Sequence, residues 1–228
     1  FGDAVRFLHA PPPRLAGAAL RALDERTHPA WTRLKFDELL AQQLSLKAHR
    51  QARAQRAAPV LAGTGVLTGQ LVARAGFALT GAQRRVWREI AHDLAQRVPM
   101  QRLLQGDVGS GKTVIAALAA LQAIESGMQV AFMAPTEILA EQHYRKLSTW
   151  LDGLGVPIAW LTGSLPAKAR RAAREGLASG AVSFAIGTHA LFQEGVEIPR
   201  LALAIVDEQH RFGVVQRLAL RGKGDTEA

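Results

Sequence analysis

A glycine-rich run of eight residues, GDVGSGKT at positions 106–113, carries the residue types that bind a nucleoside triphosphate. It fits the pattern G-x-x-x-x-G-K-[ST] in full, and its glycines let backbone N–H groups turn inward around phosphates. The Lys112 ammonium can neutralise the β- and γ-phosphates, and the Thr113 hydroxyl can ligate Mg²⁺. We therefore expect Lys112 to be catalytic and expect nucleotide contacts from Gly106, Asp107, Val108, Gly109, Ser110, Gly111, Lys112 and Thr113. The alternative is a glycine-rich turn that arose by chance.

The segments on both sides of this run favour the phosphate-binding interpretation. Leu103 and Leu104 form a short apolar run that leads directly into the loop, and an alanine-rich helix is expected from Val114 to Ala123 directly after it. A helix that begins at a phosphate contributes unpaired N–H groups and the positive end of its dipole.

An acidic pair follows the last apolar run of the chain. The run Leu201–Val206 has the composition of a buried strand, and it ends in Asp207 and Glu208. We expect Asp207 to hold Mg²⁺, directly or through water, and Glu208 to act as the catalytic base that orients and deprotonates the attacking water. On their own, the two acids would be read as a strand–helix turn in which Asp207 caps the next helix. Together with the phosphate loop, they predict a nucleoside triphosphate hydrolase.

The elements that must position these residues alternate between strand and helix from about residue 77 onward. Strands are expected at 102–105, 130–134, 157–161, 183–186 and 201–206, and helices at 113–126, 138–151, 167–177 and near residue 190. Such alternation with continuously apolar strands predicts an α/β fold, in which a parallel sheet is covered by helices on both faces. In these sheets, ligands bind beyond the carboxyl ends of the strands.

The preceding part of the chain is expected to be helical and gives no strong strand signal. Helices are predicted at Leu15–Leu23 and Leu34–Ala58, and Pro59 ends the second one. We therefore expect two regions, a helical linker region at 1–62 and an α/β domain at 63–228.

The charge of the chain favours a polyanionic partner such as nucleic acid, because the net charge is +9. A chain that simply uses arginine freely is the alternative. The helix predicted before Pro59 carries cations at a spacing of three, which form either a solvated face or a contact with a DNA backbone; they are Lys47, Arg50, Arg53 and Arg56.

The sequence contains no cysteine, which excludes disulfides and zinc–thiolate sites. No apolar run approaches the roughly 20 residues that a membrane span needs, so we expect a cytoplasmic protein with no membrane partner.

The acidic pair and the residues after it resemble a known family. Asp207–His210 is a variant of the DExH box, and with Arg211–Val214 it resembles the RecG family of branched-DNA helicases. Further segments resemble motifs of that family: LKFDELL at 34–40, FALTGAQ at 77–83, PMQRLLQ at 99–105, APTEILAEQH at 134–143, LTGS at 161–164 and GTHAL at 187–191.

The resemblance implies roles for residues that the chemistry alone does not single out. Gln83 would pair with the adenine edge and select ATP, and Phe77 would stack on the base or serve in the core. Gln209 and His210 would sense the γ-phosphate and pass its state to the DNA-binding face. Thr136, Ser164 and Thr188 would bond DNA phosphates without reading sequence, with helix capping as the alternative. His143 and His189 have no metal-ligand spacing and are expected to be structural or close to DNA.

The resemblance implies a RecA-like P-loop NTPase domain that works as the first motor domain of an ATP-dependent DNA helicase. Such enzymes act on replication forks and Holliday junctions in DNA repair and recombination. The transcription–repair coupling translocase shares the Arg-Phe-Gly extension, but it usually carries Phe where Ser110 stands and lacks the upstream helical link. A nucleotide-switched nucleic-acid-binding module and an RNA helicase remain alternatives, whereas no spare carboxylate cluster supports a nuclease.

We expect the sequence to be part of a longer chain whose wedge domain and second motor domain are its partners. No Thr-Ala-Thr-type segment follows Asp207, and the arginine-rich motif of a second motor domain is absent. An arginine finger contributes about 10³–10⁵ to the rate in related NTPases. The 228 residues alone are therefore expected to be nearly inactive.

Overall fold

The computed structural model describes residues 1–74, 76 and 78–208, and the chain divides into two compact units, Phe1–Arg56 and a second that begins at Ala57. The boundary therefore lies a few residues before the expected one at residue 62. The reason is that the N–H groups of Ala58 and Leu61 donate to the carbonyls of Arg97 and Leu94, at 2.9 Å each. This segment is thereby fastened to the second unit.

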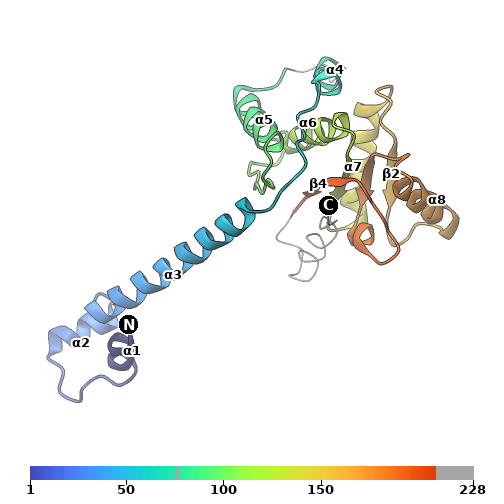
Figure 1. Cartoon of the computed structure of the whole chain (residues 1–228). Helices are drawn as coiled ribbons and strands as arrows, with labels where there is room; N and C mark the ends of the chain where they lie inside the picture. Colours follow the sequence, from blue (N-terminus) through green and yellow to red (C-terminus); the bar gives the residue numbers. More distant parts are fainter. Residues whose placement is uncertain (75, 77, 209–228) are drawn as a thin grey trace. The chain divides into compact units, whose positions relative to one another are not determined.

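The first unit consists of three helices, α1 (Gly2–His9), α2 (Gly17–Asp24) and α3 (Pro29–Ala54) (Figure 1). His28 caps α3 by accepting the N–H of Ala30 with Nδ1 at 3.1 Å, and its ring stacks on Phe7 of α1. The sequence did not predict α1, and α3 ends before Pro59 is reached. Three large apolar side chains of α3, Phe36, Leu39 and Leu44, are exposed within this unit.

The second unit is built on a four-stranded parallel sheet in the order β2-β3-β1-β4, which confirms the expected α/β fold. The strands are β1 (Gln129–Met133), β2 (Ile158–Leu161), β3 (Phe184–Gly187) and β4 (Leu201–Val206), each within two residues of its prediction. Every residue of β1 and β3 is buried, which explains why these runs are apolar throughout instead of alternating.

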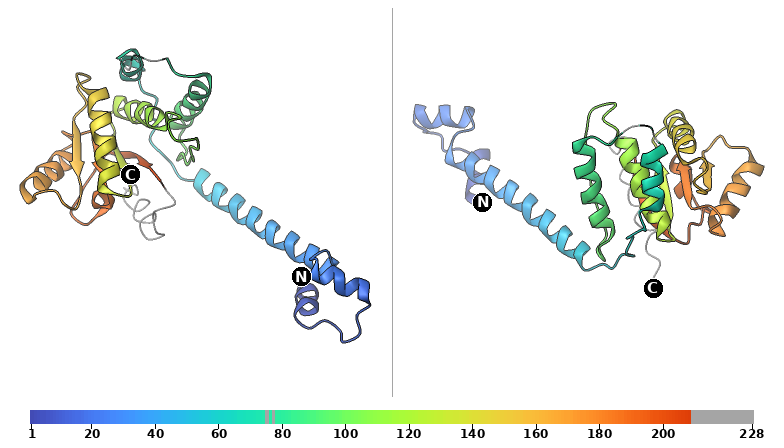
Figure 2. Two further views of the ribbon diagram at one scale, coloured as in Figure 1. Left: turned by 180° about the vertical axis from the view of Figure 1, so that it is seen from behind. Right: turned by 90° about the horizontal axis from the view of Figure 1, so that it is seen from above.

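Helices cover both faces of this sheet. They are α4 (Val66–Arg74), α5 (Gly81–Leu94), α6 (Lys112–Glu125), α7 (Glu137–Leu151), α8 (Ala167–Ala178) and the short 3₁₀ helix η1 (His189–Phe192). Val130 and Phe132 point to the face packed by α4, α5, α6 and α7, whereas Ala131 and Met133 point to the face packed by α8 and η1. Figure 2 shows α5 and α6 side by side, with α8 across the sheet from them.

Among the helices of the described residues, α6, which directly follows the glycine-rich loop, is the most deeply buried, and its Leu118 and Leu121 have no exposed surface. Its last residue holds the start of α4, because the Glu125 carboxylate accepts the N–H groups of Thr64, Gly65 and Leu67. The loop is thus anchored by a helix that cannot shift without disturbing the core. No helix among the described residues has the length and apolar character of a membrane span.

The strand predicted at residues 102–105 does not form, so this expectation was wrong. Arg102 is held by α5 instead, with its guanidinium donating to Glu89 at 2.8 Å and to Asp93 at 2.5 Å. Leu103 is 70% exposed. Two leucines between polar neighbours are too short an apolar run to outweigh these ion pairs, and the loop is entered from an irregular segment.

The end of β3 lies unusually close to β2. A β-carbon added at Gly187 would overlap the backbone carbonyl of Leu161 and press on Leu191. A backbone oxygen in a paired strand cannot move aside, so the position has room only for glycine.

We predict that Gly187→Ala destabilises the second unit by about 3 kcal/mol, because this overpacking forces β2 and β3 apart. Urea denaturation measures the change. The matched control is Gly69→Ala in α4, where the added methyl group meets no atom within 4 Å and should stabilise the helix by about 0.5–1 kcal/mol. Equal stability of Gly187→Ala and the wild type would contradict the close approach of the two strands.

Candidate nucleotide-binding site

The glycine-rich loop has the backbone geometry that its glycines predict. Gly109 and Gly111 have φ values of 83° and 87°, in the left-handed region that favours glycine, and Gly111 is the N-cap of α6. The Lys112 ammonium donates to the carbonyl oxygens of Gly106 at 2.6 Å and Asp107 at 2.9 Å. Lys112 therefore folds back onto its own loop, where it has neutral oxygens as partners that an anionic phosphate could replace.

Gln83 connects the start of α5 to this loop. It forms a capping box with Thr80, and its Nε2 donates to the carbonyl oxygen of Ser110 at 2.9 Å. A β-carbon at Gly111 would overlap this amide, so the glycine also makes room for Gln83. These two bonds use one N–H and one oxygen lone pair of the amide, so its second N–H and second lone pair are left for an adenine edge.

Asp207 lies at the carboxyl end of β4, beside the loop. Its N–H donates to the Met133 carbonyl at 2.9 Å, and its Oδ2 accepts from His143 Nε2 at 2.8 Å. The hydrogen bond from His143 lowers the pKa of Asp207, burial acts in the opposite direction, and the charge of Lys112 lowers the pKa further. Asp207 is therefore a carboxylate, close enough to Lys112 to feel its charge.

Glu208 follows Asp207 in a strained backbone conformation. Its φ is 52°, and the left-handed region costs a non-glycine residue about 1 kcal/mol or more. Such strain persists where the surroundings enforce it, and it is common at functional sites.

The donor atoms at this position suit Mg²⁺ bound together with a nucleotide. Mg²⁺ takes one or two carboxylates and fills its other positions with water and phosphate oxygens. Asp207 supplies a carboxylate and Thr113 a hydroxyl, next to the loop that would receive the phosphates. Within the described ranges, no group of three or more His, Cys, Asp and Glu side chains could hold a metal alone, and a Mg²⁺–nucleotide site does not need one.

The three hydroxyls expected to contact DNA phosphates follow β1, β2 and β3 at the same sheet edge, and the structure gives each a different environment. Thr136 caps α7 by accepting the Leu139 N–H at 3.3 Å. Ser164 donates its hydroxyl to Glu137 at 2.5 Å and its N–H at 3.0 Å. Thr188 is 2% exposed, and its hydroxyl has no partner in the described part of the chain.

Two contacting residues were not found from the sequence. His143, which was expected to be structural or close to DNA, bonds Asp207, and Glu137 joins the start of α7 to the loop after β2. His143 stands seven positions after Thr136, which is about two helical turns and places both on one side of a helix. That spacing was the available signal. Phe77, Gln209 and His210 lie outside the described residues.

Comparisons with known proteins agree with this geometry. The family model "DEAD/DEAH box helicase" matches residues 80–221. The protein "ATP-dependent DNA helicase RecG" of Escherichia coli strain K12 is 52% identical over 225 residues, which are 99% of this chain and 32% of that protein. The Aquifex aeolicus protein of the same name is 44% identical over 206 residues, covering 90% of this chain and 26% of the relative.

A solved structure described as "Structure of RecG bound to three-way DNA junction" matches with a TM-score of 0.75 and 42% identity. The match covers 80% of this chain and 25% of the solved one. The chain spans between about a quarter and a third of the length of these two curated relatives.

The contact between Ser164 and Glu137 predicts a titration shift. The hydroxyl hydrogen bond from Ser164 is the largest cause that lowers the pKa of the Glu137 carboxyl. In Ser164→Ala the backbone N–H remains but the hydroxyl is lost, so we expect this pKa to rise toward its ordinary value. Carbon-detected NMR titration of Glu137 measures the change.

The control is Thr149→Ala, which removes an exposed hydroxyl on the same helix that donates to Arg145. An identical Glu137 titration curve in the wild type and Ser164→Ala would mean that the hydroxyl does not bond this carboxylate.

Proposed function

The chain belongs to the DEAD/DEAH box helicase family, and on that premise we propose that it is the ATP-hydrolysing motor domain of a helicase that acts on branched DNA. The unit that begins at Ala57 would form the first RecA-like motor domain, and the three helices of Phe1–Arg56 would form the helical link that leads to it. The observation that carries the proposal is the meeting of the Lys112 loop with Asp207 at the end of β4, where a triphosphate and a divalent cation can be held together.

ATP binding would replace hydrogen bonds within the loop with hydrogen bonds to the phosphates. Backbone N–H groups of 106–113 receive the phosphates, and Lys112 leaves the carbonyls of Gly106 and Asp107 for phosphate oxygens, because charge-assisted hydrogen bonds are the stronger ones. Gln83 and Phe77 would contact the adenine. Thr113 and Asp207 would hold Mg²⁺, which neutralises phosphate charge when bound.

Hydrolysis needs a base that the acidic pair can supply. Glu208 would take a proton from the water that attacks the γ-phosphate, while Lys112 stabilises the negative charge that spreads over the transferred group. Gln209 and His210, which follow directly, would sense the γ-phosphate and report it to the DNA-binding side.

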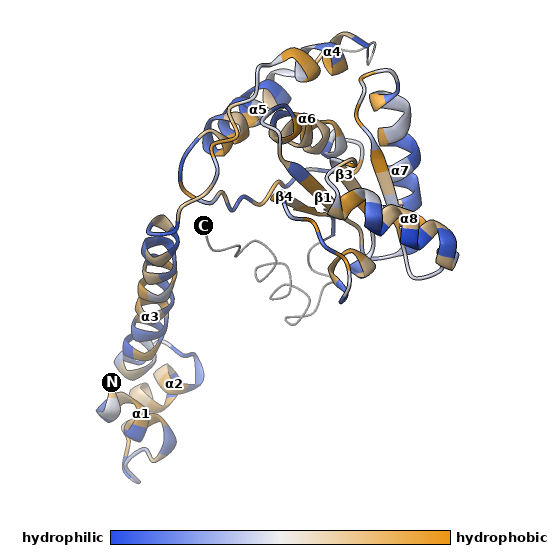
Figure 3. Cartoon of the chain, turned by 45° about the vertical axis from the view of Figure 1, so that its right-hand side comes forward, coloured by the Kyte–Doolittle hydropathy of each residue, from blue (hydrophilic) through white to orange (hydrophobic). Residues whose placement is uncertain are grey.

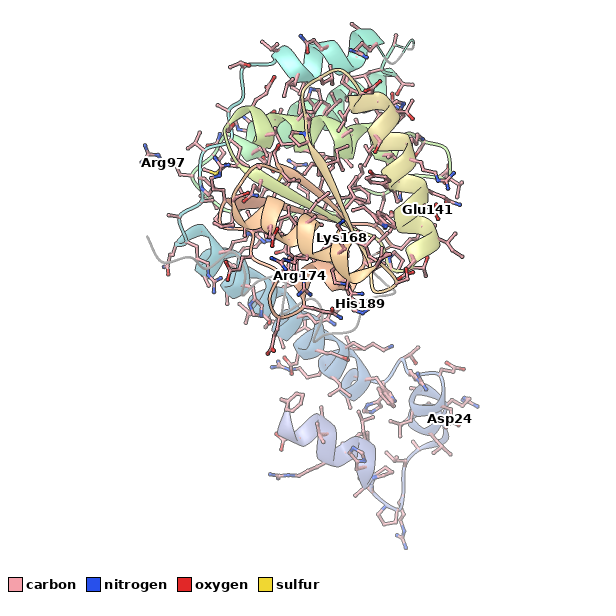
Figure 4. The ribbon with its side chains drawn as sticks, turned by 90° about the vertical axis from the view of Figure 1, so that its right-hand side faces the viewer. Asp24, Arg97, Glu141, Lys168, Arg174 and His189 are labelled. Atoms are coloured by element: carbon pink, nitrogen blue, oxygen red, sulfur yellow. The ribbon has the colours of Figure 1, made fainter. Side chains whose placement is uncertain are left out.

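The DNA would lie across the loops after β1, β2 and β3, at Thr136, Ser164 and Thr188. Positive charge on the neighbouring helix supports this placement. Helix α8 carries Lys168, Arg170, Arg171 and Arg174 and shows hydrophilic turns in Figure 3. Lys168, Arg174 and His189 lie on one side of the second unit in Figure 4. Phosphate contacts position DNA without reading its sequence, which suits recognition of forks and Holliday junctions by shape.

We propose that the wedge domain and second motor domain of a longer parent chain are the other partners of this domain. The whole would work in DNA repair and recombination in the cytoplasm. ATP would close the cleft between the two motor domains and hydrolysis would reopen it, so that the protein steps along the duplex.

Steady-state ATP turnover by the full-length parent protein can be measured with forked DNA, linear duplex or RNA as the stimulant. We expect forked DNA to give the largest stimulation of steady-state hydrolysis, because only a fork engages the wedge and the motor together. Equal stimulation by RNA would contradict the proposed function.

The control for the site is Lys112→Ala. Loss of its charge from the transition state should lower kcat by about 10²–10³-fold with every stimulant, while thermal unfolding stays unchanged because the side chain is outside the core. The matched variant Lys146→Ala removes a lysine that lies over Trp150 on α7 and should turn over like the wild type. Full activity of Lys112→Ala would show that the phosphate loop is assigned wrongly.

A further inference from the structure

Helix α7 forms polar contacts with two different segments, one at its first turn and one at its second turn. At its first turn, the Glu137 carboxylate binds the N–H and hydroxyl of Ser164, so the helix start is tied to the loop after β2. At its second turn, His143 Nε2 lies 2.8 Å from Asp207 Oδ2, at the end of β4. One rigid helix therefore touches both the edge proposed to contact DNA and the acid proposed to hold Mg²⁺.

The His143 ring is fixed in position. Its side chain is 17% exposed, and it packs against the Phe132 ring with centroids 4.7 Å apart. Phe132 belongs to β1 and is buried. Because a carboxylate can only accept, Nε2 must carry the proton and donate it to Asp207.

The helix that carries this ring can move only as a body. Ala140 and Leu147 on its inner side have no exposed surface, so a local distortion would open the core. A displacement at Thr136 and Glu137 would therefore reach His143, about 10 Å along the helix, and change its hydrogen bond to Asp207.

We propose that His143 is a positioning residue that orients the Asp207 carboxylate and, through α7, makes the nucleotide site respond to the proposed DNA-binding edge. The inference rests on the proposed function and goes beyond it, because it names the contact that transmits DNA binding to ATP hydrolysis. Some residues hydrogen-bond a metal-binding carboxylate without contacting the metal themselves. Removing such a residue typically lowers metal affinity or activity by about 10–100-fold.

The test uses the full-length parent with His143→Ala and His143→Gln. In His143→Ala we expect the stimulation of kcat by forked DNA to fall by about tenfold or more, with unchanged thermal unfolding and unchanged DNA affinity. ADP affinity in EDTA should equal that of the wild type, whereas the gain in affinity on adding Mg²⁺ should shrink. His143→Gln should recover much of both effects, because its amide Nε2 can donate from a similar position.

The control is Glu141→Gln on the same helix. Glu141 is an exposed residue that pairs with Arg145, and Figure 4 shows it on the outer side of α7. This variant should match the wild type in DNA stimulation and in Mg²⁺-dependent nucleotide affinity.

The possible results separate the two claims. In the first case, forked DNA stimulates ATP hydrolysis equally in the wild type and in His143→Ala, and Mg²⁺ raises the ADP affinity of both by the same factor. That result would overturn the role of His143 and leave the proposed function standing. A uniform loss of thermal stability that His143→Gln does not rescue would also overturn it, since the ring would then be only a packing element. A wild type that DNA does not stimulate would overturn the proposed function and the coupling role with it.

Discussion

The parallel pairing of four strands, of which β1 and β3 are buried throughout, is the constraint on which the rest of the structure depends. Because all four run in one direction, the segments that follow them meet at a single edge, and Thr136, Ser164, Thr188 and Asp207 gather there from distant parts of the chain. The pairing leaves little room for change, since Gly187 at the end of β3 has the Leu161 carbonyl where a side chain would begin. The relative positions of the polar side chains at this edge therefore depend on the pairing of the strands.

The polar groups of the nucleotide site are satisfied by one another. Lys112 bonds the carbonyls of its own loop, Gln83 bonds Ser110, and Asp207 bonds His143. A buried or half-buried polar group without a partner is costly, so these bonds stabilise the loop before a nucleotide arrives. Nucleotide binding must break the bonds of Lys112 to neutral carbonyl oxygens and replace them with bonds to phosphate oxygens. The bonds exchanged at Lys112 are local, whereas the bond between Asp207 and His143 connects the site to α7, whose first turn bonds the loop after β2 through Glu137.

The sequence predicted those parts that local composition determines. Four strands and the helices α6, α7 and α8 were found because continuous apolar runs alternate with helical periodicity, and the loop was found because its glycines, Lys112 and Thr113 follow a strict spacing. The strand expected at 102–105 was wrong, because ion pairs from Arg102 to a separate helix decide its conformation. The contact between His143 and Asp207 was missed because the two residues are 64 positions apart in the sequence. The hydroxyl of Ser164 was assigned from its position alone, and its bond to Glu137 is visible only once the loop and α7 are folded together.

The central claim is that residues 106–113 and Asp207 together receive a Mg²⁺–triphosphate, and amide hydrogen exchange of the full-length parent tests it most directly. On addition of Mg²⁺ with a non-hydrolysable ATP analogue, the account predicts slower exchange at the amides of 106–113, because these N–H groups turn to the phosphates. The protection should weaken in Asp207→Asn, which removes the carboxylate charge for Mg²⁺. Unchanged exchange across 106–113 at saturating analogue, with protection elsewhere in the chain, would contradict the account.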